Sequence, residues 1–232
     1  MFDRILLFGY GNLASAMLEG WLASGLDPGL FTVYNPRPKP VPDGVAFTTD
    51  LPSGSFDAVV LGVKPQMLAE VTGALEPLVG PEAVLLSILV SVDIAALSAR
   101  FPRVGAIARF LPNLAAALGK SPTALAGRGL GRAQCDAVTD LAARLGSAEW
   151  FEDDAHFDLV AALTASGPGF VYRFIDALAC GAAELGMDPA QAERLATRMV
   201  AGAAALAAGG PQAPGELARR VASPGGTTQR GL

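Results

Sequence analysis

The sequence predicts an α/β fold, with an N-terminal Rossmann-type doubly wound parallel sheet followed by an all-helical C-terminal domain. A glycine-rich turn separates the first apolar run from a helical pattern, and apolar runs then alternate with helical patterns up to about residue 111. Such alternation is typical of a parallel sheet with right-handed crossovers. From Glu152 onward the patterns are nearly all helical, so we place the two domains at 1–151 and 152–232.

Continuous apolar runs mark the predicted strands. Long runs without polar alternation are typical of strands that are covered on both faces. Between and after these runs, "PQMLAEVTGALEPLV" and "VDIAALSARF" show the apolar spacing of helices. The predicted strands lie at 5–8, within "LFTVYN" (30–35), at 56–63, at 83–90 and within "RVGAIARFL" (103–111).

One crossover departs from this pattern. Prolines occupy positions 36, 38, 40 and 42 of "NPRPKPVPDGV". Proline at every second position removes backbone donors and pushes its neighbours out of the α region. We therefore expect an extended connection where a doubly wound sheet normally has its second helix.

The C-terminal region carries start signals for helices. In "SGPGF" (166–170), Ser166 or Gly167 can cap a helix whose first turn includes Pro168. A second start lies at Asp188, which is followed by Pro189 and, at the third position, by Gln191 in a capping-box-like arrangement.

Composition limits the partners that this chain can have. The chain has 232 residues, of which 51% are hydrophobic and 17% charged, and its formal net charge is −5. It shows no lysine or arginine cluster, so we expect no nucleic-acid partner. Its apolar runs stay below the roughly 18 to 20 residues that span a bilayer, and the N-terminus lacks the layout of a signal peptide. These features predict a soluble cytoplasmic protein without membrane contact.

Few side chains suit metal or histidine chemistry. Cys135 and Cys180 lie within helical patterns, so we interpret them as packed thiols rather than as a disulfide or a metal pair. His156 is the only histidine and is expected on a helix surface. We predict no metal site. A hydrolase built on the carboxylates of Asp153 and Asp154 is a weaker alternative.

The segment "GYGNLA" matches a dinucleotide-binding pattern. Gly9 makes the turn, Gly11 lets the backbone approach a pyrophosphate, and Ala14 permits close packing of helix and strand. The first helical residues, Asn12 and Leu13, contribute backbone N–H groups that face the phosphates. A plain tight turn is the alternative.

The end of the second strand favours NADPH over NADH. An acid at this position would bind the ribose 2′-hydroxyl of NAD and repel a 2′-phosphate. The strand ends instead in Asn35, followed by Arg37 and Lys39, and the nearest acid is Asp43. The alternative is that the two cations are solvated loop charges, and NADH stays open as the coenzyme.

Other segments lie where a parallel sheet binds ligands. Lys64 of "GVKPQ" follows a strand and could reach a substrate anion or the coenzyme, although it also fits a surface charge. Asn113 of "FLPN" ends another strand and could face the same crevice. The chain closes on "SPGGTTQRGL" (223–232), whose paired glycines and hydroxyl groups are typical of a loop that holds a small molecule.

Taken in order, these segments resemble the pyrroline-5-carboxylate reductase family. The resemblance rests on "GYGNLASAM", "VKPQ", "SI" at Ser87, "LPN", "SGPGF" and "SPGGTTQRGL", and it runs from residue 5 to residue 232. It implies NADPH-dependent reduction of 1-pyrroline-5-carboxylate, an imino acid, to L-proline by hydride transfer to a cyclic iminium. It also implies a homodimer formed through the C-terminal helices, with a higher oligomer left open.

The resemblance assigns roles to individual residues. It places the substrate between the coenzyme and the terminal loop, which is contributed across the dimer, with Thr228 as the catalytic residue nearest the imine nitrogen. The implied substrate-binding residues are Ser223, Gly225, Gly226, Thr227 and Thr228, and the implied coenzyme-binding residues are Gly9, Gly11, Asn12, Leu13, Ala14, Asn35, Arg37, Val63, Lys64, Pro65 and Ser87.

The chain departs from the family pattern at several points. The proline-rich connection alters the region that contacts the adenosine phosphate. Gly169 and Phe170 stand where the family more often has alanine and tyrosine, and Leu114 stands where threonine is usual. Family members usually continue for several helical turns beyond "SPGGTT", so we expect the usual C-terminal continuation to be missing.

Two rival functions remain on the same fold. One is a reductase of another small cyclic imine or oxo acid, which the altered residues would permit. The other is a catalytically silent protein that binds nucleotide as a sensor or assembly factor. Retention of both glycines and both threonines in the terminal loop argues against a silent protein.

Overall fold

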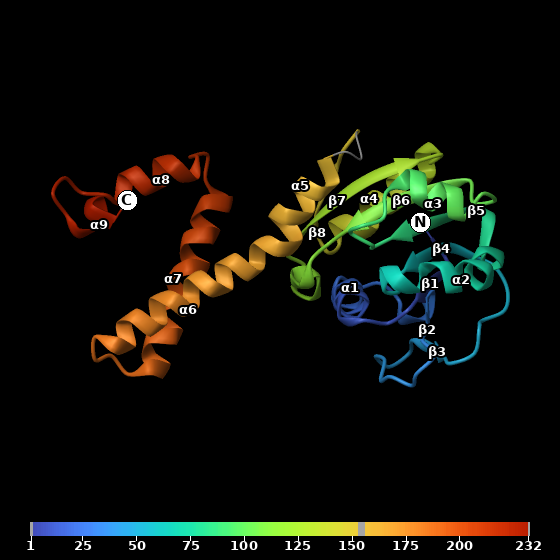
Figure 1. The fold of residues 1–232 in the computed structure, drawn as a ribbon, viewed down its shortest axis with the longest axis horizontal. Coiled ribbons are helices and arrows are strands. Elements are labelled where there is room, and N and C mark those ends of the chain that lie inside the picture. Colours follow the sequence, from blue (N-terminus) through green and yellow to red (C-terminus); the bar gives the residue numbers. More distant parts are fainter. Residues whose placement is uncertain (1, 153–155, 232) are drawn as a thin grey trace. The chain divides into compact units, whose positions relative to one another are not determined.

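The computed structural model describes residues 2–152 and 156–231. The chain divides into two compact units, Met1–Gly167 and Pro168–Leu232, which we call the N-terminal unit and the C-terminal unit (Figure 1).

The N-terminal unit contains one eight-stranded sheet in the order β3-β2-β1-β4-β5-β6-β7-β8. Neighbouring strands from β3 to β6 are parallel, β7 is antiparallel to β6, and β8 is parallel to β7. The strands are β1 (Ile5–Phe8), β2 (Phe31–Tyr34), β3 (Ala46–Thr48), β4 (Phe56–Leu61), β5 (Val79–Ser87), β6 (Ala106–Leu111), β7 (Ser121–Arg128) and β8 (Gly146–Trp150).

Helices cover both faces of this sheet, as predicted for a doubly wound fold. Alternate residues of β1 point to opposite faces, so Leu7 joins one buried cluster and Leu6 another. Apolar side chains of α1 (Asn12–Ala23) and α4 (Arg132–Ala143) complete the first cluster. Those of α2 (Leu68–Leu75) and α3 (Ile94–Arg100) complete the second.

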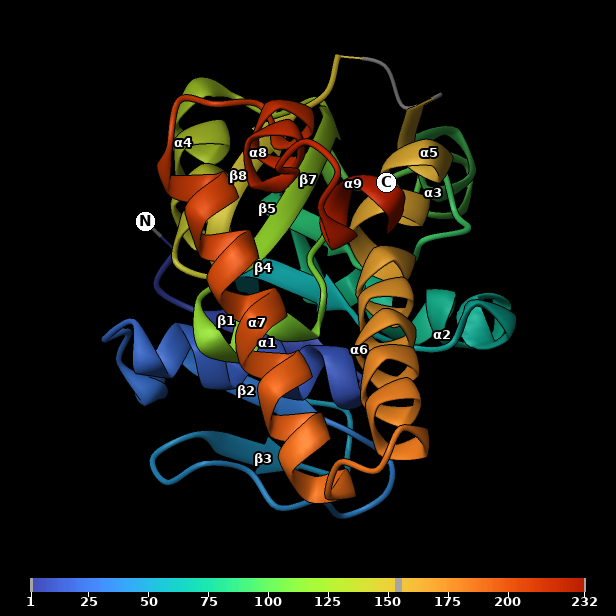
Figure 2. The ribbon, with the colours of Figure 1, turned by 90° about the vertical axis from the view of Figure 1, so that its left-hand side faces the viewer.

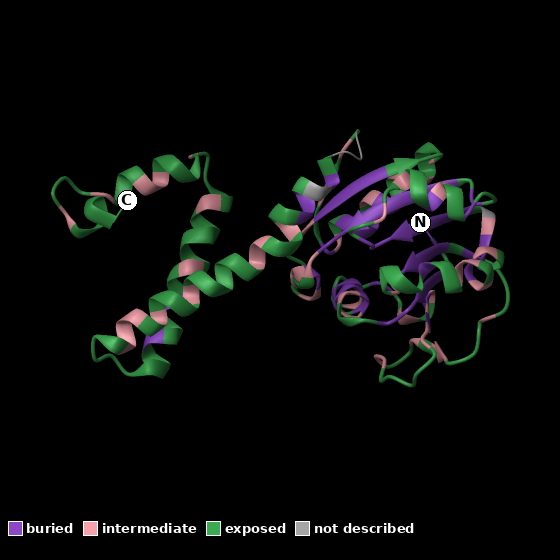
Figure 3. Ribbon diagram, viewed as in Figure 1, coloured by how far each residue is buried: buried purple, intermediate pink, exposed green. Residues whose placement is uncertain are grey.

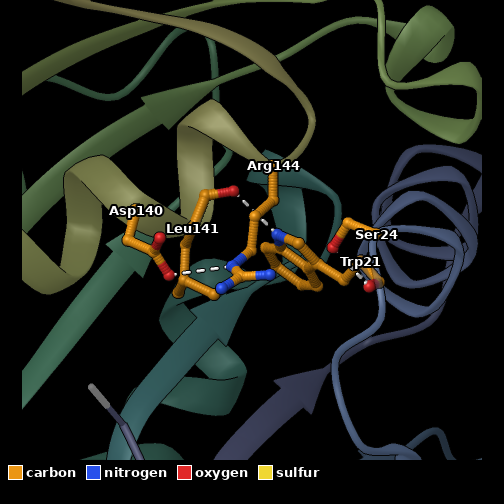
Figure 4. A network of polar contacts seen from close by, with 5 residues as sticks. All are labelled: Trp21, Ser24, Asp140, Leu141 and Arg144. Carbon is orange, nitrogen blue, oxygen red and sulfur yellow. Dashed lines mark hydrogen bonds and ion pairs between the residues drawn. The ribbon is translucent and has the colours of Figure 1, made fainter.

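A buried hydrogen bond joins α1 to α4 (Figure 4). The indole Nε1 of Trp21, whose side chain is fully buried, donates to the carbonyl oxygen of Leu141 over 2.9 Å. At the surface, Arg144 Nε lies 2.8 Å from Asp140 Oδ2 within the α4 region, and Ser24 Oγ donates to the carbonyl of Trp21. Of these contacts, the Trp21 hydrogen bond fixes α1, which begins in the glycine motif, against the neighbouring helix α4.

The five predicted strands are observed as β1, β2, β4, β5 and β6, one of them with a shift. The predicted strand at 83–90 is observed as β5 at Val79–Ser87. Ile88 and Leu89 follow β5 but are still buried, so the apolar run extends past the strand itself. β3, β7 and β8 were not predicted from the sequence, and the antiparallel β7 departs from the predicted parallel sheet.

The proline-rich connection contains no helix, as predicted. Residues 35–45 follow β2 without regular structure and lead into β3, a short strand at the sheet edge. Val41 and Val45 are partly buried and pack against the first cluster, which fixes the far end of the connection to the core.

The predicted helix start at "SGPGF" is wrong. α5 (Phe157–Ala161) continues through a π-helical turn (Ala162–Ser166) directly into α6 (Gly167–Glu184), and Gly167 has helical backbone angles. Pro168 therefore lies inside a continuous helical segment. A proline removes one helical N–H and clashes with the preceding turn, and the widened π turn just before it relieves that conflict.

The C-terminal unit is helical throughout its regular structure. α6 and α7 (Pro189–Gly209) run in opposite directions and are joined by a short turn (Figure 2). As predicted, Asp188 caps α7, because its carboxylate accepts a hydrogen bond from the Gln191 N–H at 2.9 Å. α8 (Pro214–Val221) and α9 (Thr227–Gly231) complete the unit.

The predicted boundary at 151/152 and the division at 167/168 differ by α5 and the π turn. Phe157 and Val160 of α5 are buried against Leu111 and Ala126 of the sheet, so by packing α5 belongs to the N-terminal unit. That a separate helical domain begins at residue 152 therefore stays a prediction.

The thiols and the histidine have surface or partly buried positions. Cys135 in α4 is half-buried and Cys180 in α6 is exposed, and both are free thiols. The expectation that Cys180 is packed is therefore wrong for the single chain. His156 is exposed, as predicted, whereas Asp153 and Asp154 lie outside the described residues. Among the described residues, no helix is both long and apolar enough to cross a membrane.

Candidate active site

The glycine turn after β1 is closed by the turn after the neighbouring strand β4. Gly9 has a φ of 93°, which favours glycine, and a Cβ at this position would lie 2.8 Å from the Gly62 carbonyl oxygen. A Cβ on Gly62 would in turn lie 2.9 Å from the carbonyl oxygen of Gly9. The two turns therefore need glycine on both sides. Sequence reasoning identified Gly9 but not the matching requirement at Gly62.

The start of α1 fits a dinucleotide phosphate. Gly11 is the N-cap residue and provides no side-chain cap, and a Cβ built on it would meet nothing within 4 Å. The N–H groups of Asn12 and Leu13 therefore lie in an uncapped first turn with open space before it, where an anion is favoured. Ala14 is only 1% exposed, which is consistent with the close packing expected at the third motif position.

The end of β2 is tied to the glycine turn through Tyr10. Asn35 Oδ1 accepts a hydrogen bond from the Tyr10 N–H at 3.2 Å, and Asn35 Nδ2 donates to the carbonyl of Arg37 at 2.6 Å. Lys39 Nζ donates to the carbonyl oxygen of Tyr10 at 2.6 Å. Arg37 itself is exposed. The predicted coenzyme residues Asn35 and Arg37 thus lie at the same end of the sheet as the glycine motif.

The segments after β4 and β5 differ in exposure. Lys64 is exposed and precedes a short 3-10 turn that begins at Pro65, and Val63 is partly buried. Ser87 is fully buried, and its Oγ accepts a hydrogen bond from the Leu89 N–H at 3.3 Å. The Ser87 hydroxyl therefore supports the turn after β5, and its side chain is covered in the single chain.

Asn113 has a structural role that links two motifs of the sequence. Its Nδ2 donates to the Thr164 carbonyl at 2.8 Å, and its Oδ1 accepts from the Ala115 N–H at 2.9 Å. Thr164 lies four residues before Pro168, so its carbonyl is the one that a helical N–H at 168 would reach. The asparagine of "LPN" therefore satisfies the carbonyl that the proline of "SGP" leaves open. The expectation that its side chain faces the crevice is replaced by this contact.

The terminal loop forms a turn that leads into α9. Gly225 has a φ of 71°, and its N–H donates to Gln229 Oε1 at 2.6 Å, while the Gly226 N–H donates to the Ser223 carbonyl at 2.9 Å. Thr227 and Thr228 begin α9 and are exposed, as is Ser223. Both glycine N–H groups therefore have partners within the loop.

The predicted site residues fall into two groups. The eleven predicted coenzyme residues, from Gly9 to Ser87, lie in the N-terminal unit, and the five predicted substrate residues, Ser223 to Thr228, lie in the C-terminal unit. Within the N-terminal unit, the structure brings the glycine turn, the end of β2 and the turn after β4 to one edge of the sheet.

A buried arginine outside the predicted set lines a cavity of about 760 Å³ beside α3. Arg109 is 2% exposed, its Nη2 donates to the Val90 carbonyl at 2.5 Å, and its guanidinium lies 4.3 Å from the centre of the Phe157 ring. These contacts connect β6, the loop after β5 and α5. The sequence signal for this site is a charged residue, Arg109, inside an apolar strand.

An ion pair that shifts a carboxyl pKa lies away from this edge of the sheet. The side-chain hydrogen bond from Arg103 lowers the pKa of Glu76, and the two groups lie 2.6 Å apart at the end of α2. Among the described residues, no group of three or more histidine, cysteine, aspartate or glutamate side chains could hold a metal ion.

Comparison with known proteins identifies the family. Residues 154–232 match the family model described as pyrroline-5-carboxylate reductase dimerisation. Pyrroline-5-carboxylate reductase of Pseudomonas aeruginosa is 32% identical over 240 residues, which cover 99% of this chain and 87% of that protein. The chain belongs to the pyrroline-5-carboxylate reductase family. The family member from Methanosarcina acetivorans is 30% identical over 99% of this chain and 88% of its own length.

Solved structures agree with this assignment. A pyrroline-5-carboxylate reductase from Coxiella burnetii is 27% identical, with a TM-score of 0.85 over 99% of this chain and 88% of that one. Pyrroline carboxylate reductase from Plasmodium falciparum, solved with NADP bound, is 20% identical and shares the fold with a TM-score of 0.88 over the same shares. The predicted fold class and the resemblance to this family are confirmed.

Proposed function

We propose that this chain is an NAD(P)H-dependent oxidoreductase that reduces 1-pyrroline-5-carboxylate to L-proline, the last step of proline biosynthesis. The observation that carries the proposal is the 32% identity to a pyrroline-5-carboxylate reductase over 99% of the chain. That similarity spans both the glycine turn and the terminal loop, which are the two halves of the expected site.

NADPH is the coenzyme that the residues favour. The end of β2 carries Asn35 rather than an acid, and the exposed Arg37 lies two residues later. A carboxylate at this point would repel a 2′-phosphate, whereas the side chains of Arg37 and Lys39 attract it. The relative from Plasmodium falciparum was solved with NADP, which supports the same preference.

The proposed reaction depends more on positioning the coenzyme and the substrate than on proton transfer by side chains. When bound, the coenzyme supplies a hydride to the carbon of the C=N bond, and the electron pair of that bond moves to the iminium nitrogen. The chain holds the pyrophosphate at α1 and aligns the substrate from the terminal loop, so that two reactants are held in line. The exposed Thr228 hydroxyl orients the ring nitrogen in this arrangement.

The terminal loop receives the substrate carboxylate with its backbone and hydroxyl groups. Because Gln229 Oε1 occupies the Gly225 N–H, the side chain of Gln229 must turn away before that donor can bind the carboxylate. The Thr227 and Ser223 hydroxyls are already exposed. We propose that the substrate carboxylate displaces the Gln229 side chain from the Gly225 N–H.

We further propose that two copies assemble through the C-terminal helices and that each terminal loop serves the partner's coenzyme site. The match to the dimerisation model supports this assembly. Many large apolar side chains of the C-terminal unit are exposed in the single chain, as expected of a surface that a second copy covers. They are Phe170, Val171, Tyr172, Phe174, Leu178, Leu185, Leu195, Met199 and Leu206. The cytoplasmic location expected from the sequence stays a prediction.

A substrate panel tests the proposed reaction. Consumption of NADPH and of NADH is followed with pyrroline-5-carboxylate, with a six-membered cyclic imine and with a 2-oxo acid. We expect pyrroline-5-carboxylate to give the highest kcat/KM, with NADPH preferred. Preference for another imine or for the oxo acid would assign a different reductase. Coenzyme binding without turnover on any of them would assign the nucleotide sensor.

Thr228 separates substrate positioning from coenzyme binding. We expect Thr228→Ala to lower kcat by about tenfold to a hundredfold, because the substrate nitrogen loses its orienting hydroxyl. Thr228→Ser, which keeps the hydroxyl, is the matched control and should retain most of the turnover. The Kd for NADPH, measured by protein fluorescence, should not change in either variant. Equal losses of turnover and of NADPH affinity would mean that the terminal loop is not the substrate site.

A further inference from the structure

The proline-rich connection is anchored at both ends, and one anchor is a lysine on the glycine turn. At its far end, Val41 and Val45 pack on the core, and Gly44 adopts a φ of 84° beside Pro28. At its near end, Lys39 Nζ lies 2.6 Å from the Tyr10 carbonyl oxygen. The alternating prolines restrict the backbone between these anchors. The connection therefore restricts the backbone on both sides of Lys39, whose ammonium group contacts the glycine turn.

The contact with Tyr10 fixes the peptide groups of the phosphate-binding turn. Tyr10 lies between Gly9 and Gly11, and its ring is buried in the core with 5% exposure. Asn35 binds its N–H and Lys39 binds its carbonyl oxygen, so both backbone polar groups of this residue are held by side chains from beyond β2. A turn flanked by glycines has wide conformational freedom, which these two hydrogen bonds restrict.

The ammonium group of Lys39 has capacity beyond this hydrogen bond. A lysine ammonium carries three donors, and the Tyr10 carbonyl uses one of them. The residue is exposed, and among the ion pairs of the described residues none joins Lys39 to a carboxylate. The group therefore places a positive charge at the carboxyl ends of β1 and β2. In Rossmann folds this is the edge that holds the adenosine ribose.

We infer that Lys39 is both a positioning residue for the phosphate-binding turn and, beside the exposed Arg37, a residue that selects the 2′-phosphate of NADPH. One N–H of its ammonium orders the Tyr10 peptide, and the other two bind the 2′-phosphate. This inference rests on the proposed function only in the choice of coenzyme. It explains how a connection without a helix can carry coenzyme selectivity.

Direct coenzyme binding tests this inference without any imine substrate, so its failure is distinguishable from failure of the proposed reaction. In the full-length protein, we expect Lys39→Met to raise the Kd for NADPH by about tenfold or more, since it removes a charged hydrogen bond. The Kd for NADH should rise by no more than about threefold, through the loosened turn. Lys39→Arg restores a charged donor and should recover most of the NADPH affinity.

Lys120→Met is the matched control, because it also removes an exposed lysine charge, in a loop before β7. It should leave the ratio of the two Kd values unchanged. Equal weakening of NADPH and NADH in Lys39→Met would overturn the selectivity, and unchanged affinity for both would overturn the inference as a whole. If Lys39→Met does not fold, the salt dependence of coenzyme binding by the unaltered protein provides a second test. Its preference for NADPH should fall as NaCl is raised, and a preference independent of salt would contradict the inference.

Discussion

The two units of this chain differ in how completely they bury their apolar side chains (Figure 3). The N-terminal unit contains fully buried large side chains such as Trp21, Phe31 and Phe110. In α6 to α9, the buried hydrophobic residues among those described are Ala192 and Ala196, while Phe170 is 72% exposed and Leu185 is 92% exposed. One unit therefore has a complete core within a single chain, and the other presents apolar faces that need a cover.

The contrast separates two kinds of stability. A unit that buries its own core folds on contacts within one chain, whereas a helical unit with exposed aromatic side chains gains its apolar burial from association. We therefore expect substitutions in the C-terminal unit to act first on assembly, and substitutions in the N-terminal unit to act first on the free energy of unfolding.

Phe174 of α6 provides the strongest test of assembly. We expect Phe174→Glu to convert the proposed dimer into monomers and to abolish turnover, because burying an unpaired charge in an apolar interface costs several kcal/mol. Sedimentation velocity measures the change in mass. Glu184→Lys, at an exposed polar position of the same helix, is the control and should stay dimeric. A Phe174→Glu protein of unchanged mass would refute the role of this face in the dimer.

Gly20 tests the core of the N-terminal unit. A Cβ at Gly20 would lie 2.1 Å from the Ala116 carbonyl oxygen, so Gly20→Ala forces α1 away from that segment. We expect a loss of about 2–3 kcal/mol in the free energy of unfolding, measured by urea denaturation.

Gly73 in α2 is the matched control for that substitution. A Cβ there meets nothing within 4 Å, so Gly73→Ala should stabilise the protein by up to about 1 kcal/mol through helix propensity. Similar effects of the two substitutions would contradict the packing described for α1.

Asn113 tests the link between the sheet and the helical segment that contains Pro168. Asn113→Ala leaves the Thr164 carbonyl without its donor and should cost about 1–3 kcal/mol. In a Pro168→Ala background, residue 168 regains an N–H that can reach this carbonyl, so the same substitution should cost less. Thermal unfolding of the four proteins of this double-mutant cycle gives the coupling. Strict additivity would show that asparagine and proline act independently.

Much of the N-terminal fold was predictable because its signals are local. The glycine motif, the buried strands β1, β2, β4 and β6, and the proline-rich connection each follow from residue types within a short window. β7 and β8 were missed because "SPTALAGR" combines proline, glycine and two alanines with a single β-branched residue, Thr123, and "GSAEW" has no continuous apolar run. Their strand conformation depends on pairing across the sheet, which no local pattern contains.

The candidate site was predictable in its residues but less so in its contacts. The sequence indicated Asn35, Arg37 and Lys39 as a group near the adenosine, yet the hydrogen bonds of Asn35 and Lys39 to Tyr10 depend on how two loops meet. The helix start predicted at "SGPGF" failed because a π turn and the distant Asn113 accommodate the proline. Such long-range compensation cannot be inferred from local capping rules.

Transfer of an isotope label distinguishes hydride delivery to the imine from coenzyme binding alone. NADPH deuterated at C4 of the nicotinamide, on either face in separate experiments, is incubated with the protein and 1-pyrroline-5-carboxylate. We expect one of the two labelled coenzymes to give proline with deuterium on the ring carbon that was double-bonded to nitrogen. Proline free of deuterium from both coenzymes, or coenzyme that binds without forming proline, would contradict the proposed reaction.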